Sequence, residues 1–107
     1  MNIFKGRILC TEDDADTREL IAWVLTDQGF DVICANSASH ALELAKGQHF
    51  DLYLMDRFMP GLSGTELTKK LREFDIKTPI LFTREPYLNQ IKKRLVWRER
   101  KGTWSNQ

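Results

Sequence analysis

The chain has 107 residues, of which 42% are apolar and 29% are charged, so it holds one hydrophobic core of ordinary size and is not disordered or fibrous in composition. Its net charge at pH 7 is +1, and no apolar stretch approaches the roughly 20 residues that span a bilayer. The start shows no secretory signal, and both cysteines, Cys10 and Cys34, lie in short apolar runs. These features predict a single-domain cytoplasmic protein with reduced thiols and no membrane contact.

The first half of the chain alternates short apolar segments with amphipathic ones. Residues 7–10 are mostly apolar and lead into acidic residues, which favours a strand. Residues 16–28 carry an apolar stripe at helical spacing and are followed by a glycine, and residues 31–35 form a second apolar strand. A second helix is predicted to begin at Asn36 or Ser37, either of which can cap it. Its expected buried face consists of Ala38, Ala41, Leu42 and Ala45.

The second half repeats this pattern. Residues 52–55 form a third apolar strand that leads into Asp56, and the proline and glycines within residues 57–64 indicate a loop. Residues 65–74 are predicted to be helical, and residues 78–83 to form a fourth strand. The apolar face of this third helix consists of Leu67, Leu71 and Phe74. Strict alternation of strands and helices predicts an α/β protein, with a parallel sheet covered by helices on both faces.

Acidic residues follow two of the predicted strands. Residues 12–14 are all acidic and follow the first strand, Asp56 follows the third, and Thr83 ends the fourth. Functional side chains of parallel α/β sheets gather at the carboxyl ends of the strands. If the first and third strands are neighbours, three carboxylates converge and need a counter-charge, for which Mg²⁺ is the natural partner. The alternative is that these acids are ordinary loop residues, and that Asp14 or Asp16 caps the first helix.

Through these residues, the sequence resembles the receiver domain of bacterial two-component response regulators. The most specific match is the Met-Pro-Gly-x-x-Gly run that begins three residues after Asp56. The resemblance extends over residues 7–83 and implies a three-layer, flavodoxin-like, doubly wound parallel sheet. The matching segments are residues 7–14 with Arg18, residues 51–64 and residues 78–83.

The resemblance also implies a metal site. Carried over residue by residue, it makes Glu12 and Asp13 the acidic pair that binds Mg²⁺, together with Asp56 and the backbone carbonyl of Phe58. Three consecutive acids leave the register of the pair open, and Asp14 is the alternate, with a structural role as its favoured interpretation.

The remaining implications concern phosphoryl transfer. Asp56 matches the phospho-accepting aspartate, and Thr83 matches the hydroxyl that hydrogen-bonds the phosphoryl group. The implied function is a signalling module that takes a phosphoryl group from the phosphohistidine of a sensor histidine kinase or a histidine phosphotransfer protein. It would not be an enzyme beyond catalysing its own phosphorylation and dephosphorylation.

Residues 84–107 depart from the receiver pattern. Receivers of this kind continue with a fifth strand that ends in a lysine followed by a proline, and no such segment follows Thr83. One amphipathic helix is predicted instead, after Pro86. The segment has seven basic and two acidic residues, so it is interpreted as a basic helical tail on a receiver core of residues 1–83. Its apolar face consists of Leu88, Ile91 and Leu95.

Three interpretations of this tail stay open. It is the truncated or out-of-frame end of a longer receiver, a basic helix that binds nucleic acid or another protein, or a solvated helix without a partner. Truncation is favoured because the composition changes abruptly, and nucleic-acid binding is disfavoured because no reading motif is recognised. The missing lysine leaves an alternative function, a degenerate receiver that binds proteins but is not effectively phosphorylated. The missing fifth strand predicts an exposed sheet edge through which the protein can form homo-oligomers.

Overall fold

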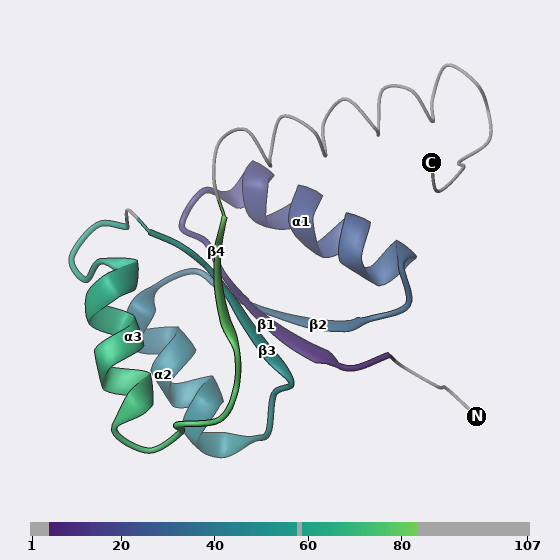
Figure 1. Cartoon of the computed structure of the whole chain (residues 1–107). Coiled ribbons are helices and arrows are strands. Elements are labelled where there is room, and N and C mark those ends of the chain that lie inside the picture. Colours follow the sequence, from purple (N-terminus) through teal and green to yellow (C-terminus); the bar gives the residue numbers. More distant parts are fainter. Residues whose placement is uncertain (1–4, 58, 84–107) are drawn as a thin grey trace, which may run out of the picture.

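The computed structural model describes residues 5–57 and 59–83 of the chain. Strands and helices alternate through these residues, as the sequence predicts (Figure 1). The elements are β1 (Arg7–Thr11), α1 (Ala15–Asp27), β2 (Asp31–Ala35), α2 (Ala38–Gly47), β3 (Leu52–Asp56), α3 (Gly64–Arg72) and β4 (Ile80–Thr83).

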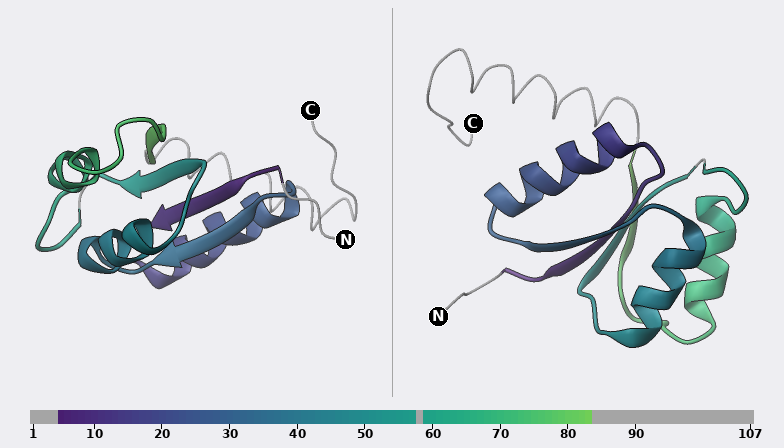
Figure 2. Two further views of the ribbon diagram at one scale, coloured as in Figure 1. Left: turned by 90° about the horizontal axis from the view of Figure 1, so that it is seen from below. Right: turned by 180° about the vertical axis from the view of Figure 1, so that it is seen from behind.

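The described strands form one parallel sheet in the order β2-β1-β3-β4. Helix α1 covers one face of this sheet, and α2 and α3 lie side by side on the other (Figure 1, Figure 2). Because both faces are covered, each strand can be almost continuously apolar. The arrangement confirms the predicted α/β fold with a doubly wound sheet between two helical layers.

Two hydrophobic clusters fill the space between the layers. Alternation along β1 sends Leu9 towards α2 and α3, and sends Ile8 and Cys10 towards α1. The buried members on the α1 side are Ile8, Cys10, Ile21 and Leu54. Those on the other side are Leu9, Ala35, Ala38, Ala41, Ala45, Phe50, Tyr53, Met55, Met59, Leu67 and Leu71.

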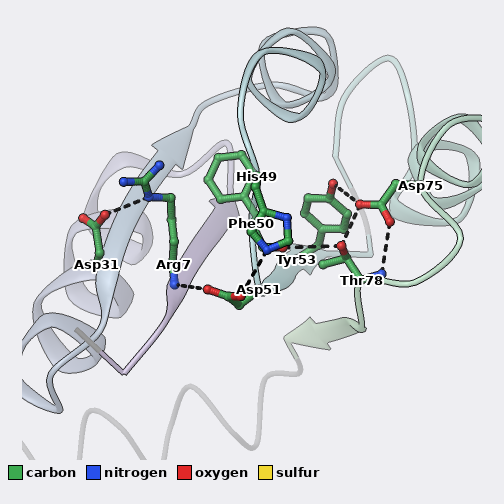
Figure 3. Close-up of polar contacts among 8 residues, drawn as sticks. All are labelled: Arg7, Asp31, His49, Phe50, Asp51, Tyr53, Asp75 and Thr78. Atoms are coloured by element: carbon green, nitrogen blue, oxygen red, sulfur yellow. Dashed lines mark hydrogen bonds and ion pairs between the residues drawn. The ribbon is translucent and has the colours of Figure 1, made fainter. Parts of the chain in front are cut away.

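Polar contacts connect the strands at their amino ends (Figure 3). Arg7 and Asp31 are register partners in β1 and β2, and the Arg7 Nε donates a hydrogen bond of 2.8 Å to the Asp31 carboxylate. The backbone N–H of Arg7 donates to Asp51, which also contacts the ring of His49 at 3.2 Å. These groups are solvent-exposed, so they add little stability, but they hold the strand ends in register.

A second polar cluster turns the chain from α3 into β4 (Figure 3). The hydroxyls of Thr78 and Tyr53 donate to one oxygen of Asp75 at 2.6 and 2.7 Å. These hydrogen bonds hold the pKa of Asp75 well below its usual range. The guanidinium of Arg72 donates to the backbone carbonyls of Asp75 and Thr78 at 2.8 Å each. The turn is therefore fixed from both sides.

This turn explains why one sequence prediction was wrong. Helical spacing places Phe74 on the buried face of α3, but α3 ends at Arg72 and Phe74 is 44% exposed. One boundary also differs: β4 begins at Ile80, because the chain up to Thr78 belongs to the turn. Leu42, predicted on the buried face of α2, is only partly buried against the core. The spacing of apolar residues does not indicate the residue at which a helix ends.

Strand β4 lies at the edge of the described sheet. Leu81 is the register partner of Leu54, so both side chains point to the face that carries α1. Leu54 is buried, whereas Leu81 is 56% exposed, because α1 packs against β1 and β2 and does not extend over β4. Within residues 5–57 and 59–83, β3 is the one strand that pairs with β4.

The predictions for residues 84–107, including the final helix, its apolar residues and the lack of a fifth strand, lie outside the described residues. Among the residues that the structure describes, no helix has both the length and the apolar character needed to cross a bilayer.

Candidate functional site

The acidic residues that follow β1 and β3 meet at one edge of the sheet. Strands β1 and β3 are hydrogen-bonded neighbours, so their carboxyl ends lie side by side. Carboxylate oxygens of Glu12, Asp13 and Asp56 all lie within 4.8 Å of one another. The structure thus brings together three of the four residues that were predicted to bind metal; the fourth, Phe58, lies outside the described residues.

Glu12 is the buried member of this cluster. Only 4% of its surface is exposed, and its backbone N–H donates a hydrogen bond of 3.1 Å to the carbonyl of Ala35 in β2. Burial, with smaller contributions from the neighbouring carboxylates of Asp13 and Asp56, raises the pKa of Glu12 to about 7, against a hydrogen bond from the Asp14 backbone that lowers it. The ionised form of Glu12 is therefore disfavoured mainly by burial and in part by the negative charge of its neighbours.

Asp14 plays a different part from its two predecessors. It is the N-cap of α1, and one of its carboxylate oxygens accepts hydrogen bonds from the Thr17 backbone N–H at 2.9 Å and the Thr17 hydroxyl at 2.6 Å. Such a cap satisfies backbone donors at the start of the helix. Asp16, the other residue considered for this role, is the acidic residue of the first turn. The three consecutive acids are therefore divided between a carboxylate cluster and a helix cap.

Arg18 holds the backbone of the acidic segment in place. Its guanidinium donates hydrogen bonds to the carbonyl oxygens of Glu12, at 2.8 Å, and Asp13, at 3.4 Å. The sequence match includes Arg18 without indicating what it contacts. The sequence shows only that a basic residue lies one turn into α1. The structure is needed to identify the carbonyl oxygens that its side chain contacts.

Thr83 lies next to Asp56, because the two are register partners in β4 and β3. The Thr83 side chain is buried, and its hydroxyl donates to the carbonyl of Met55 at 3.5 Å. A hydroxyl is thus available beside the carboxylate, at the edge of the sheet where the acidic cluster lies.

The loop after Asp56 returns to contact the backbone of that residue through Gly64. A Cβ atom on Gly64 would lie 2.6 Å from the Asp56 carbonyl oxygen and 2.9 Å from the Arg57 Cα, closer than van der Waals contact permits. The Gly64 N–H also donates to the Arg57 carbonyl at 2.8 Å. Sequence reasoning assigned Gly64 to a loop, and missed this close approach. The Gly-x-x-Gly spacing was the only sequence signal of this contact.

The chemistry of this donor set fits a hard divalent cation. Carboxylate oxygens are the ligands that Mg²⁺ prefers, and a cation would favour the ionised form of Glu12, which burial and the neighbouring carboxylates disfavour. The ligand atoms are already grouped at one point. The residues that would hold Mg²⁺ are Glu12, Asp13 and Asp56.

Comparisons with known proteins point to one family of domains. Residues 8–94 match the family described as the response regulator receiver domain. The regulatory protein AtoC of Escherichia coli is 35% identical over 76 residues, which are 71% of this chain and 16% of that protein. The chain spans about a third or less of the length of the curated relatives that it matches.

Solved structures show the same likeness. The chemotaxis protein CheY4 of Vibrio cholerae aligns with a TM-score of 0.70 and 29% identity, over 82% of this chain and 78% of that one. The response regulator TrrA of Thermotoga maritima, solved in complex with Mg²⁺-BeF, aligns with a TM-score of 0.69 and 30% identity, over 76% and 72% of the two chains.

Proposed function

The chain belongs to the family of response regulator receiver domains, and on that premise we propose that Asp56 accepts a phosphoryl group in a reaction that depends on Mg²⁺. The donor is the phosphohistidine of a sensor histidine kinase or of a histidine phosphotransfer protein. The observation that carries the proposal is the convergence of Glu12, Asp13 and Asp56 within 4.8 Å, with Thr83 as the register partner of Asp56.

The proposed chemistry needs little from the protein beyond position and charge. An oxygen of the Asp56 carboxylate attacks the phosphorus, the phosphorus–nitrogen bond of the donor breaks, and the imidazole leaves with a proton taken from solvent. Because a carboxylate is a weak nucleophile, alignment and charge neutralisation must supply most of the rate. Bound Mg²⁺ supplies neutralisation of charge on the phosphoryl oxygens.

The protein's own groups divide the remaining tasks. Glu12 and Asp13 hold the cation beside Asp56, and the Arg18 guanidinium fixes the backbone that carries them. The Thr83 hydroxyl turns from the Met55 carbonyl to donate to a phosphoryl oxygen. This movement is small, since Thr83 and Asp56 are register partners at one edge of the sheet.

Intact-mass analysis tests the proposal. The full chain is incubated with acetyl phosphate, with and without Mg²⁺, and the mass of one phosphoryl group is expected to appear only with the metal. Asp56→Asn should abolish the adduct. Asp16→Asn is the matched control, because it removes the same charge from an exposed site in the first turn of α1. An adduct that persists in Asp56→Asn, or a wild-type chain that never gains one, would contradict the proposal.

A further inference from the structure

Two thiols lie side by side in the sheet. Cys10 in β1 and Cys34 in β2 are direct register partners. Register partners in a parallel sheet point to the same face, and both thiols pack in the cluster beneath α1. The two thiols lie close enough to shift each other's pKa, that of Cys10 upwards and that of Cys34 downwards. Both cysteines are free, so the sheet holds a preformed dithiol.

The two sulfurs differ in access. Cys10 is 1% exposed, whereas Cys34 is only partly buried near the outer edge of the sheet, in strand β2. The interaction with the Cys10 thiol, and to a smaller extent the positive charge of Arg18, lower the pKa of Cys34 to about 7 against the effect of burial. An oxidant from solvent therefore reaches Cys34 first, and Cys10 lies beside it as the second thiol.

We propose that Cys10 and Cys34 are a redox modification site, which closes to a disulfide across β1 and β2 when the protein meets a hydroperoxide. The Cys34 sulfur attacks a peroxide oxygen, the oxygen–oxygen bond breaks, and the leaving hydroxide takes a proton to become water. This step leaves a sulfenic acid on Cys34. The Cys10 sulfur then attacks the Cys34 sulfur, the sulfur–oxygen bond breaks, and a second water leaves with the Cys10 proton.

The spacing of the strands makes this bond reversible. Neighbouring strands lie about 4.8 Å apart, which is within the range of Cα separations that disulfides bridge, about 4.4–6.8 Å. The Cβ atoms of a relaxed disulfide are closer than this spacing, at about 3.8 Å, so a bond between directly paired residues forms under strain. A strained disulfide is more easily reduced, which suits a bond that forms and opens rather than a permanent crosslink.

The test uses the reduced full-length chain and hydrogen peroxide. After exposure, the protein is denatured and treated with N-ethylmaleimide, and its intact mass is measured. The wild type is expected to lose two hydrogen atoms, take up no maleimide, stay monomeric on a non-reducing gel, and regain both reactive thiols after dithiothreitol. Wild-type protein that takes up two maleimides, or that forms a disulfide between chains, overturns the proposal.

Two variants separate the roles of the sulfurs. Cys34→Ser should show no oxidation product at Cys10, because the remaining thiol is buried. Cys10→Ser should retain a sulfenic acid on Cys34, detectable as a dimedone adduct, because the second thiol is gone. Dimedone labelling at Cys10 in Cys34→Ser, equal to that at Cys34 in Cys10→Ser, would contradict the assigned order. The measurement on the wild type tests the proposal even if a variant folds poorly. Asp56→Asn should be oxidised to the same extent as the wild type.

Discussion

Thr83 is the register partner of Asp56, yet its hydroxyl is hydrogen-bonded to the carbonyl of Met55, at 3.5 Å. Hydroxyl donors usually approach carbonyls to about 2.5–3.0 Å, so this hydrogen bond is long and weak. The hydroxyl can therefore exchange its present acceptor for a stronger one at Asp56 with little loss of free energy.

Replacing Thr83 should accordingly affect phosphorylation more than folding. Thr83→Val keeps the shape of the side chain and removes the hydroxyl, so the free energy of unfolding should change by less than about 1 kcal/mol. The rate of Asp56 phosphorylation by acetyl phosphate should fall several-fold, as followed by intact mass over time. Thr83→Ser keeps the hydroxyl and is the control that should remain near the wild-type rate. Equal rates in all three proteins would argue against a role for the hydroxyl.

Substitution of the adjacent residues Asp13 and Asp14 should have different effects, on metal binding and on helix capping respectively. Asp13→Ala removes a member of the carboxylate cluster and should weaken Mg²⁺ binding by at least about tenfold, measured by calorimetry. Asp14→Ala removes the N-cap of α1 and should cost about 1 kcal/mol of stability while leaving Mg²⁺ affinity unchanged. Loss of affinity in Asp14→Ala alone would shift the metal pair by one residue.

The buried carboxyl of Glu12 should make stability depend on pH. Its pKa is about 7 in the folded chain and near 4.5 when unfolded. Below pH 4.5 both states are protonated; between 4.5 and 7 only the folded state keeps the proton, so stability falls as pH rises through that window. Without Mg²⁺, Glu12→Gln should be more stable than the wild type at pH 8, by on the order of 1–2 kcal/mol, because the neutral amide avoids the cost of burying a charge. The two proteins should be equally stable at pH 4.

Urea unfolding at the two pH values measures this difference. Added Mg²⁺ should raise the stability of the wild type at pH 8, since a ligand that binds the folded state stabilises it, and should do less for Glu12→Gln. A constant difference between the proteins at both pH values would show that burial of Glu12 is not what sets its proton affinity.

Gly64 should tolerate no side chain. In Gly64→Ala the Cβ would meet the Asp56 carbonyl oxygen at 2.6 Å, so the loop or β3 must shift, at a cost of about 1–3 kcal/mol. Gly47→Ala is the matched control, because a Cβ there meets nothing within 4 Å and Gly47 ends α2. That control should be neutral, or stabilising by up to about 1 kcal/mol. Equal unfolding curves for Gly64→Ala and the wild type would show that the contact relaxes at no cost.

The exposed edge should promote self-association. Leu81 is 56% exposed on β4, next to the unpaired backbone edge of the described sheet. Such an edge is a template for another strand, and a charged residue on it opposes pairing. Sedimentation of the wild type should show mass increasing with concentration, and Leu81→Lys should reduce the increase. Ile76→Lys is the control, because Ile76 is 78% exposed but precedes β4. A wild type that stays monomeric at all concentrations would contradict this expectation.

The sequence predicts most of the fold because apolar periodicity reports burial directly. It places β2 at the bounds that the structure shows, and it narrows the cap of α2 to Asn36 or Ser37, of which Ser37 is correct. It fails at Phe74, where the helical period continues past Arg72 although hydrogen bonds to Asp75 have already turned the chain.

The site is less accessible to sequence reasoning than the fold. Residues 12–14 share one charge and one local setting, so only the backbone geometry at the start of α1 separates Asp14 from the other two. Glu12 and Asp56 are far apart in the chain, and their proximity follows from the pairing of β1 with β3, which no local pattern encodes. The assignment of Asp56, Thr83 and the metal ligands stays a prediction that the experiments above test.

Arg18 has a thermodynamic consequence for ion binding. Its guanidinium bonds to the carbonyl oxygens of Glu12 and Asp13 and leaves their carboxylates to the cluster. Fixing the backbone of one residue costs about 1–2 kcal/mol of conformational entropy, and here that ordering accompanies folding. A cation then meets ligands that are already in place, so its binding entropy should come mainly from the water that ion and carboxylates release.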